Sequence, residues 1–89
     1  MEEILQRFKT SLGIKNEAKD SYFLERISAE IEELSAQGIE IDDSKDADIQ
    51  LVADIVEFNY LNAEKPAPLP PFITSRIARR KTKARCGNA

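Results

Sequence analysis

Glycine and proline are rare in this 89-residue chain, and their positions constrain its fold more than any other feature. The chain has three glycines and four prolines, and all four prolines lie between residues 66 and 71. An all-β domain of this size needs turn residues every ten or so positions. The stretches between the breaks are long enough for helices, so the sequence predicts an all-α protein built around a single small core.

Three segments carry apolar residues at helical spacing and predict the main helices. Residues 2–12 and 21–37 are each followed by a glycine, Gly13 and Gly38, as expected for left-handed helix caps. A third helix is predicted from residue 46 to about residue 62. Together the three are expected to form a small bundle around eight buried side chains: Phe8, Phe23, Leu24, Ile27, Ile31, Leu34, Val52 and Val56.

Polar residues before the second and third helices are candidates for N-caps. Asp20 or Ser21 is expected to cap the second helix, and Asp43 or Ser44 the third, because their side-chain oxygens accept from free backbone amides.

The third predicted helix is apolar on two sides. One side faces the other helices, whereas Leu51, Ile55 and Phe58 lie on the opposite side. A helix that is apolar on two sides needs a second partner. We therefore expect these three residues to remain partly exposed in a monomer and to form an oligomer interface.

The prolines divide the chain into three parts. Residues 1–65 are predicted to form the helical bundle domain, residues 66–71 a stiff proline-rich linker, and residues 72–89 a short basic C-terminal helix and tail. The linker is expected to carry the tail away from the bundle. No apolar stripe continues after Ala78, so residues 79–89 are predicted to be disordered in the free protein.

Charge is distributed unevenly along the chain. Residues 1–65 hold all 16 acidic residues and have a net charge of −9, whereas residues 66–89 have a net charge of +6. The basic tail can neutralise DNA phosphates, dock on an acidic protein surface, or simply remain solvated, and protein docking is favoured. No aromatic residue follows Phe72, so stacking on bases is not supported. The predicted partner-binding residues are Arg76, Arg79, Arg80, Lys81, Lys83 and Arg85.

The composition disfavours an enzyme. The chain has no histidine and one cysteine, Cys86, so neither a Ser–His nor a Cys–His pair can form within it. No catalytic residue, cofactor or metal site is expected. The N-terminus is acidic where a signal peptide is basic, and no apolar run exceeds three residues, so we expect a cytosolic product without a membrane span.

One acidic cluster resembles a calcium loop. Asp42, Ser44, Asp46 and Asp48 occupy alternate positions, but the sixth and twelfth positions, where such a loop requires glycine and glutamate, are alanines. The favoured interpretation is compensation of the helix dipole at the start of the third helix.

The order of the segments resembles the small head–tail connector proteins of tailed bacteriophages and prophages, also called head-completion or DNA-packaging adaptor proteins. The resemblance covers roughly residues 4 to 80. It rests on the following segments in this order: Leu12-Gly13-Ile14, Asp20-Ser21-Tyr22, Gly38-Ile39-Glu40-Ile41, the stretch from Asp48 to Asp54, Tyr60-Leu61-Asn62, and Leu69-Pro70-Pro71 before a final basic helix.

The resemblance implies a structural, non-enzymatic virion protein. Such a subunit forms a homo-oligomeric ring on assembly, docks on the portal vertex, extends the DNA channel and receives a downstream tail or stopper protein. Before assembly it can be either oligomeric or monomeric. It acts in the virion and assembles in the host cytoplasm, and DNA passes through without sequence recognition. The alternative is a small regulatory or non-specific DNA-binding helical protein that uses its basic C-terminal tail.

Overall fold

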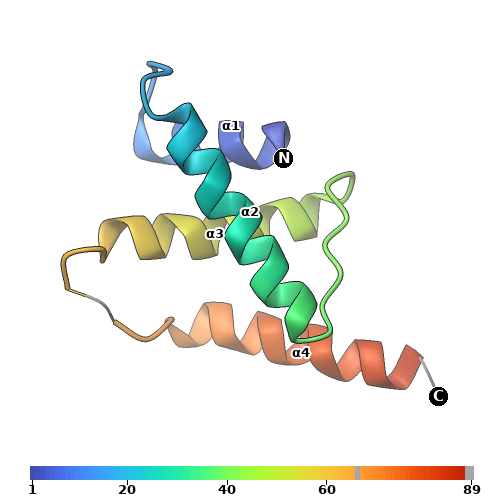
Figure 1. The fold of residues 1–89 in the computed structure, drawn as a ribbon. Coiled ribbons are helices and arrows are strands. Elements are labelled where there is room, and N and C mark those ends of the chain that lie inside the picture. Colours follow the sequence, from blue (N-terminus) through green and yellow to red (C-terminus); the bar gives the residue numbers. More distant parts are fainter. Residues whose placement is uncertain (66, 88–89) are drawn as a thin grey trace.

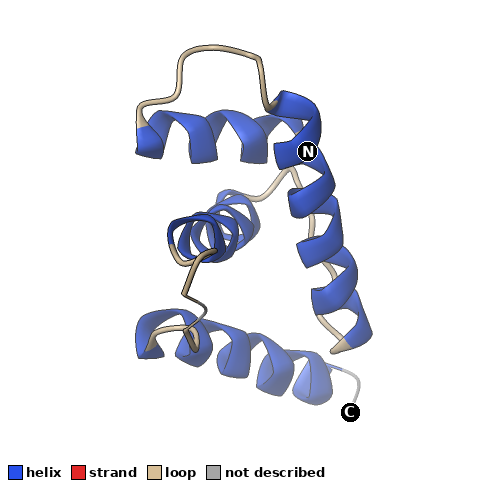
Figure 2. Ribbon diagram, turned by 60° about the vertical axis from the view of Figure 1, so that its left-hand side comes forward, coloured by secondary structure: helices blue, strands red, loops and turns tan. Residues whose placement is uncertain are grey.

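The protein is described here by a computed structural model, which places residues 1–65 and 67–87, with side chains up to Lys81. Within these residues all regular secondary structure is helical, as the sequence predicts. The helices are α1 (Glu2–Leu12), α2 (Asp20–Ala36), α3 (Asp46–Leu61) and α4 (Pro71–Gly87). Helix α3 lies between α1 and α4, with α2 along one side (Figures 1 and 2). No helix in this described part is long and apolar enough to span a membrane.

The first two helices end as the glycines predict. Gly13 and Gly38 adopt φ angles of 72° and 88°, in the left-handed region that glycine enters without strain. The amides of Gly38 and Ile39 return to the carbonyls of Ser35 and Leu34, at 2.9 Å each. This is the Schellman pattern, and it buries Ile39 beside the end of α2.

The predicted N-caps are wrong. Lys19 and Lys45 occupy the positions before α2 and α3, and neither makes a side-chain cap bond. Asp20 is instead the first residue of α2, where its carboxylate accepts from Lys9 Nζ at 2.8 Å. A contact between two helices, invisible in local sequence, thus replaces the local cap.

The core matches most of the prediction and extends beyond it. Six of the eight expected residues are buried, and Leu24 and Ile31 are partly buried against the core. Further buried apolar side chains come from α1, α3, α4 and the segment before α3: Ile4, Leu5, Ile39, Ile49, Leu51, Ala53, Ile55 and Ile73.

The second apolar side of α3 is not exposed, which corrects the expectation for Leu51 and Ile55. Both side chains are 2% exposed, and Phe58 is half-buried. Helix α4 packs along α3 and contributes Ile73, which is buried, and Ile77, which is partly buried. The second partner that α3 requires is therefore supplied by the chain itself.

Helix α4 is neither short nor carried away from the body. It is 17 residues long and ends at Gly87. The prediction of disorder is therefore wrong for residues 79–87. The linker before α4 returns the chain antiparallel to α3 instead of projecting outward (Figure 1). Pro66, Asn88 and Ala89, to which parts of these predictions refer, lie outside the described residues.

Candidate functional site

The basic residues of α4 meet carboxylates on the chain's own α3. Arg76 Nη1 donates to Asp54 Oδ2 at 2.5 Å, and Arg80 Nη1 donates to Asp48 Oδ1. Because the two helices are antiparallel, the later arginine pairs with the earlier aspartate. The sequence predicts a tail that meets the negative charge of another molecule, but for Arg76 and Arg80 the negative charge comes from α3 of the same chain.

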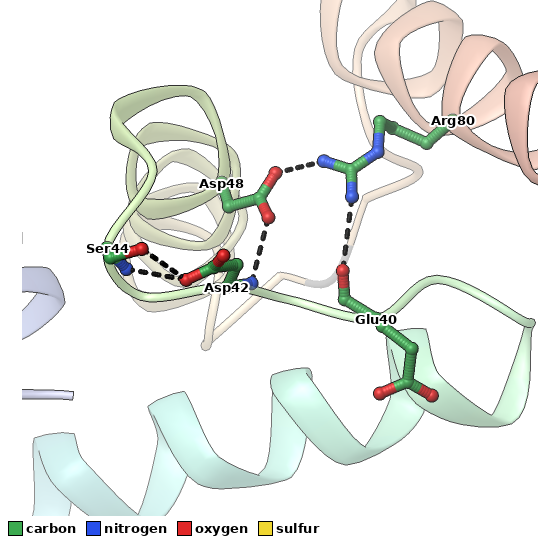
Figure 3. A network of polar contacts seen from close by, with 5 residues as sticks. All are labelled: Glu40, Asp42, Ser44, Asp48 and Arg80. Carbon is green, nitrogen blue, oxygen red and sulfur yellow. Dashed lines mark hydrogen bonds and ion pairs between the residues drawn. The ribbon is translucent and has the colours of Figure 1, made fainter.

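Asp48 is the centre of this contact (Figure 3). Its side chain is 4% exposed, and its second carboxylate oxygen accepts from the backbone amide of Asp42 at 2.8 Å. Arg80 also donates through Nη2 to the carbonyl oxygen of Glu40 at 3.1 Å. One guanidinium thereby joins α4 to both α3 and the segment that precedes it.

Asp42 forms a local turn beside this network. Its Oδ1 accepts from the hydroxyl of Ser44 at 2.6 Å and from the Ser44 amide at 2.9 Å. These two hydrogen bonds, led by the hydroxyl, lower the pKa of the Asp42 carboxyl from its ordinary value. Asp46 and Asp48 lie in the first turn of α3, where they oppose the helix dipole. No group of three metal-ligating side chains gathers anywhere in the part of the chain described.

The predicted basic patch is divided by the fold. Arg76 and Arg80 face α3, whereas Arg79 is exposed and Lys81 is half-buried, and neither of the latter two forms an ion pair with another described residue. Lys83 and Arg85 belong to α4, but their side chains lie outside the described ones, as does that of Cys86. Two of the six predicted residues are thus occupied within the chain.

The predicted oligomer interface is also redistributed. Leu51 and Ile55 lie in the core, in the region that α4 covers, so they offer no free surface in this conformation. Phe58 keeps a partly accessible side chain.

An aromatic groove, which the sequence analysis did not predict, opens between α2 and α3. It has a volume of about 210 Å³ and is lined by Phe8, Tyr22, Phe23, Arg26, Glu30, Val56, Asn59, Tyr60 and Ala63. Three rings pack edge to face, with Phe8 and Phe23 centroids 4.9 Å apart and Tyr60 5.6 Å from Phe23. The rings come from three helices, so sequence spacing within one helix gives no signal for the cluster.

The groove combines a buried floor with an accessible wall. Phe8 and Phe23 are buried, whereas Tyr22 is 51% exposed and Tyr60 37% exposed. The Tyr22 ring lies 5.9 Å from that of Phe23. The site therefore offers aromatic surface to a ligand without exposing the core beneath it.

A half-buried carboxylate also lines the groove. Glu30 Oε1 accepts from Asn59 Nδ2 at 2.9 Å. Burial raises the pKa of Glu30 above its ordinary value, and this effect exceeds the opposing influence of Arg26 and of the Asn59 hydrogen bond, while repulsion by Glu33 adds to the rise.

Comparison of the chain with protein-family models, with curated proteins and with solved structures finds no match. Its function is therefore inferred from the surfaces described above and from the order of its sequence segments.

Proposed function

We propose that this protein is a structural virion protein, a head–tail connector subunit that forms a ring on the portal vertex and extends the DNA channel. Its partners are the portal protein and a downstream tail or stopper protein. It acts in the virion after assembly in the host cytoplasm, and the proposal includes neither an enzymatic activity nor a cofactor. The order of segments from residue 4 to residue 80 and the all-helical fold support it.

The observation that carries the choice of an adaptor over a DNA clamp is the pairing of the α4 arginines with α3. A clamp needs cations that are free to contact phosphates. Arg76 and Arg80 are instead paired with Asp54 and Asp48. A channel through which DNA slides should not hold phosphates tightly, and internal neutralisation of these two cations suits that requirement.

The alternative remains non-specific DNA binding by the rest of α4. Exposed Arg79 favours it, as do the cations that follow in the sequence, Lys81, Lys83 and Arg85. Four phosphate contacts would give a salt slope of about −3.6 in log–log terms, since each contributes about −0.9. The alternative therefore predicts DNA affinity that falls steeply with salt.

Light scattering with negative-stain imaging, at high protein concentration and after mixing with a portal protein encoded beside this chain, tests the proposal. A connector forms rings alone or co-assembles with the portal particle. A monomer that does not bind the portal protein but binds duplex DNA tightly at low salt, as seen in a gel mobility shift, would contradict the proposal and support the alternative.

A further inference from the structure

We propose that the aromatic groove between α2 and α3 is a docking site for the basic C-terminal part of α4, from Arg79 onward, of a second copy of this chain. The contact deepens the proposed function by naming the surfaces that join neighbouring subunits. It rests on the proposed function only for closure into a ring, because contact between two copies depends on the groove and α4 alone.

The groove has the chemistry of a cation site. A guanidinium or ammonium group is attracted to the faces of aromatic rings, and the attraction grows when water is excluded. Tyr22 and Tyr60 supply accessible rings, and the Phe23 ring lies within 6 Å of both, with centroid distances of 5.9 and 5.6 Å. An arginine or lysine side chain of an incoming helix fits such a surface, with its aliphatic part against the rings.

Glu30 adds a charge that lacks full compensation. Burial disfavours its ionised form, and Glu33, one turn later, repels it further. Arg26, one turn earlier, also lines the groove and partly offsets these effects, but the structure forms no ion pair between Arg26 and Glu30. A cation that enters the groove would therefore neutralise a carboxylate that is only partly solvated.

The basic end of α4 is the complementary surface on the same chain. Residues 66–89 contain six cations and no acidic residue. Arg76 and Arg80 are committed to α3, whereas Arg79 is exposed to solvent and the sequence continues with Lys81, Lys83 and Arg85. Beyond Arg80 the sequence of α4 thus carries three more cations and no acidic residue.

The groove cannot be filled by the α4 of its own subunit in this fold. Arg80 pairs with Asp48 at the start of α3, whereas Tyr60 lies twelve residues later, about 18 Å further along the helix. Helix α4 runs antiparallel to α3, so its C-terminal end lies toward the start of α3 (Figure 1). The groove residue Tyr60 belongs to the last turn of α3. Contact must therefore join different copies, and a head-to-tail contact of this kind closes into a ring when the rotation permits.

A fluorescein-labelled synthetic peptide of residues 77–89 tests the contact directly. Titration with the full-length protein should raise its anisotropy saturably. Tyr22→Ala and Glu30→Gln should each weaken binding by about three- to tenfold, and the new glutamine amide still offers an oxygen to Asn59. Phe72→Ala is the matched control, because Phe72 is an exposed aromatic residue outside the groove and its loss should leave binding unchanged. Thermal unfolding of each variant establishes that it is folded.

Mixing two defective chains tests the head-to-tail geometry. One chain carries Tyr22→Ala with Glu30→Gln, and the other carries Arg79→Glu, Lys83→Glu and Arg85→Glu. Each alone should sediment as a monomer, whereas the mixture should form a one-to-one dimer through its single intact contact. Heterodimers would support the contact even if the native chain formed no closed rings. The absence of rings would count against the proposed connector function and not against the contact.

The inference would be overturned by the absence of peptide binding, by equal binding by the groove variants and Phe72→Ala, or by a mixture that stays monomeric while the native chain assembles. Rings that persist in Tyr22→Ala with Glu30→Gln would likewise reject this contact while supporting the connector.

Discussion

At the scale of single residues, the buried carboxylate of Asp48 makes contacts that local sequence patterns do not predict. It lies among the alternating acids that resemble a calcium loop, yet its oxygens accept from the Asp42 amide and the Arg80 guanidinium. The aspartates at the start of α3 suggest dipole compensation. Nothing in their spacing indicates that an arginine 32 residues after Asp48 donates to its carboxylate. Ion-pair partners distant in sequence are set by tertiary packing, and periodicity does not report them.

Removal of either member of the Asp48–Arg80 pair should destabilise the protein. Asp48→Ala leaves the Asp42 amide and a partly buried guanidinium without their acceptor, and Arg80→Ala leaves a buried carboxylate with one donor. We expect a loss of about 2 kcal/mol for each. Urea unfolding of the two single variants and the double variant gives the coupling energy. Arg79→Ala is the control, and an equal loss for it would contradict the assignment.

The raised pKa of Glu30 predicts a particular pH dependence. The folded state holds the Glu30 proton more tightly than the unfolded chain, in which the pKa is near 4.5. The penalty for ionising Glu30 is therefore fully present above the folded pKa and is relieved as the pH falls toward 4.5. As the pH is lowered from 7 to about 4.5, the Tm of the native protein should therefore rise relative to the Tm of Glu30→Gln. A difference in Tm that stays constant across that range would contradict this burial effect.

At the scale of helices, sequence patterns predict α1, α2 and α3 well and α4 poorly. Apolar spacing and the glycine caps place the first three helices within one or two residues of their observed ends. The apolar stripe of α4 consists of little more than Ile73 and Ile77. The ion pairs that Arg76 and Arg80 make with α3 add to the packing but give no periodic apolar signal in the sequence. The weak apolar signal of α4 also explains why the sequence pattern predicts an oligomer interface at Leu51 and Ile55. They are buried because α4 of the same chain packs against α3.

Shortening a core side chain under α4 should cost stability in the monomer. Ile55→Ala is expected to lower the free energy of unfolding by about 2–5 kcal/mol, because it removes buried methyl groups and leaves a cavity. Leu61→Ala is the control, since Leu61 is exposed at the end of α3, and its effect should stay below about 0.5 kcal/mol. If Ile55→Ala unfolds in urea like the native chain, α4 does not cover this side of α3 in solution.

At the scale of the whole molecule, the groove and the basic end of α4 lie toward opposite ends of α3. The groove between α2 and α3 lies near the end of α3. Exposed Arg79 is instead the neighbour of Arg80, which pairs with Asp48 at the start of α3. The net charges of residues 1–65 and 66–89 already indicate this asymmetry. The sequence gives no sign of the groove, because aromatic rings from three helices meet only after folding.

The central claim is that this chain assembles with copies of itself and does not clamp DNA. Sedimentation velocity of the concentrated full-length protein with a labelled DNA duplex, at about 50 and 200 mM salt, tests both parts at once. We expect the protein to sediment as oligomers at both salt concentrations while the duplex sediments slowly and unbound. A protein that remains monomeric, binds the duplex at the lower salt and releases it at the higher salt would contradict this claim.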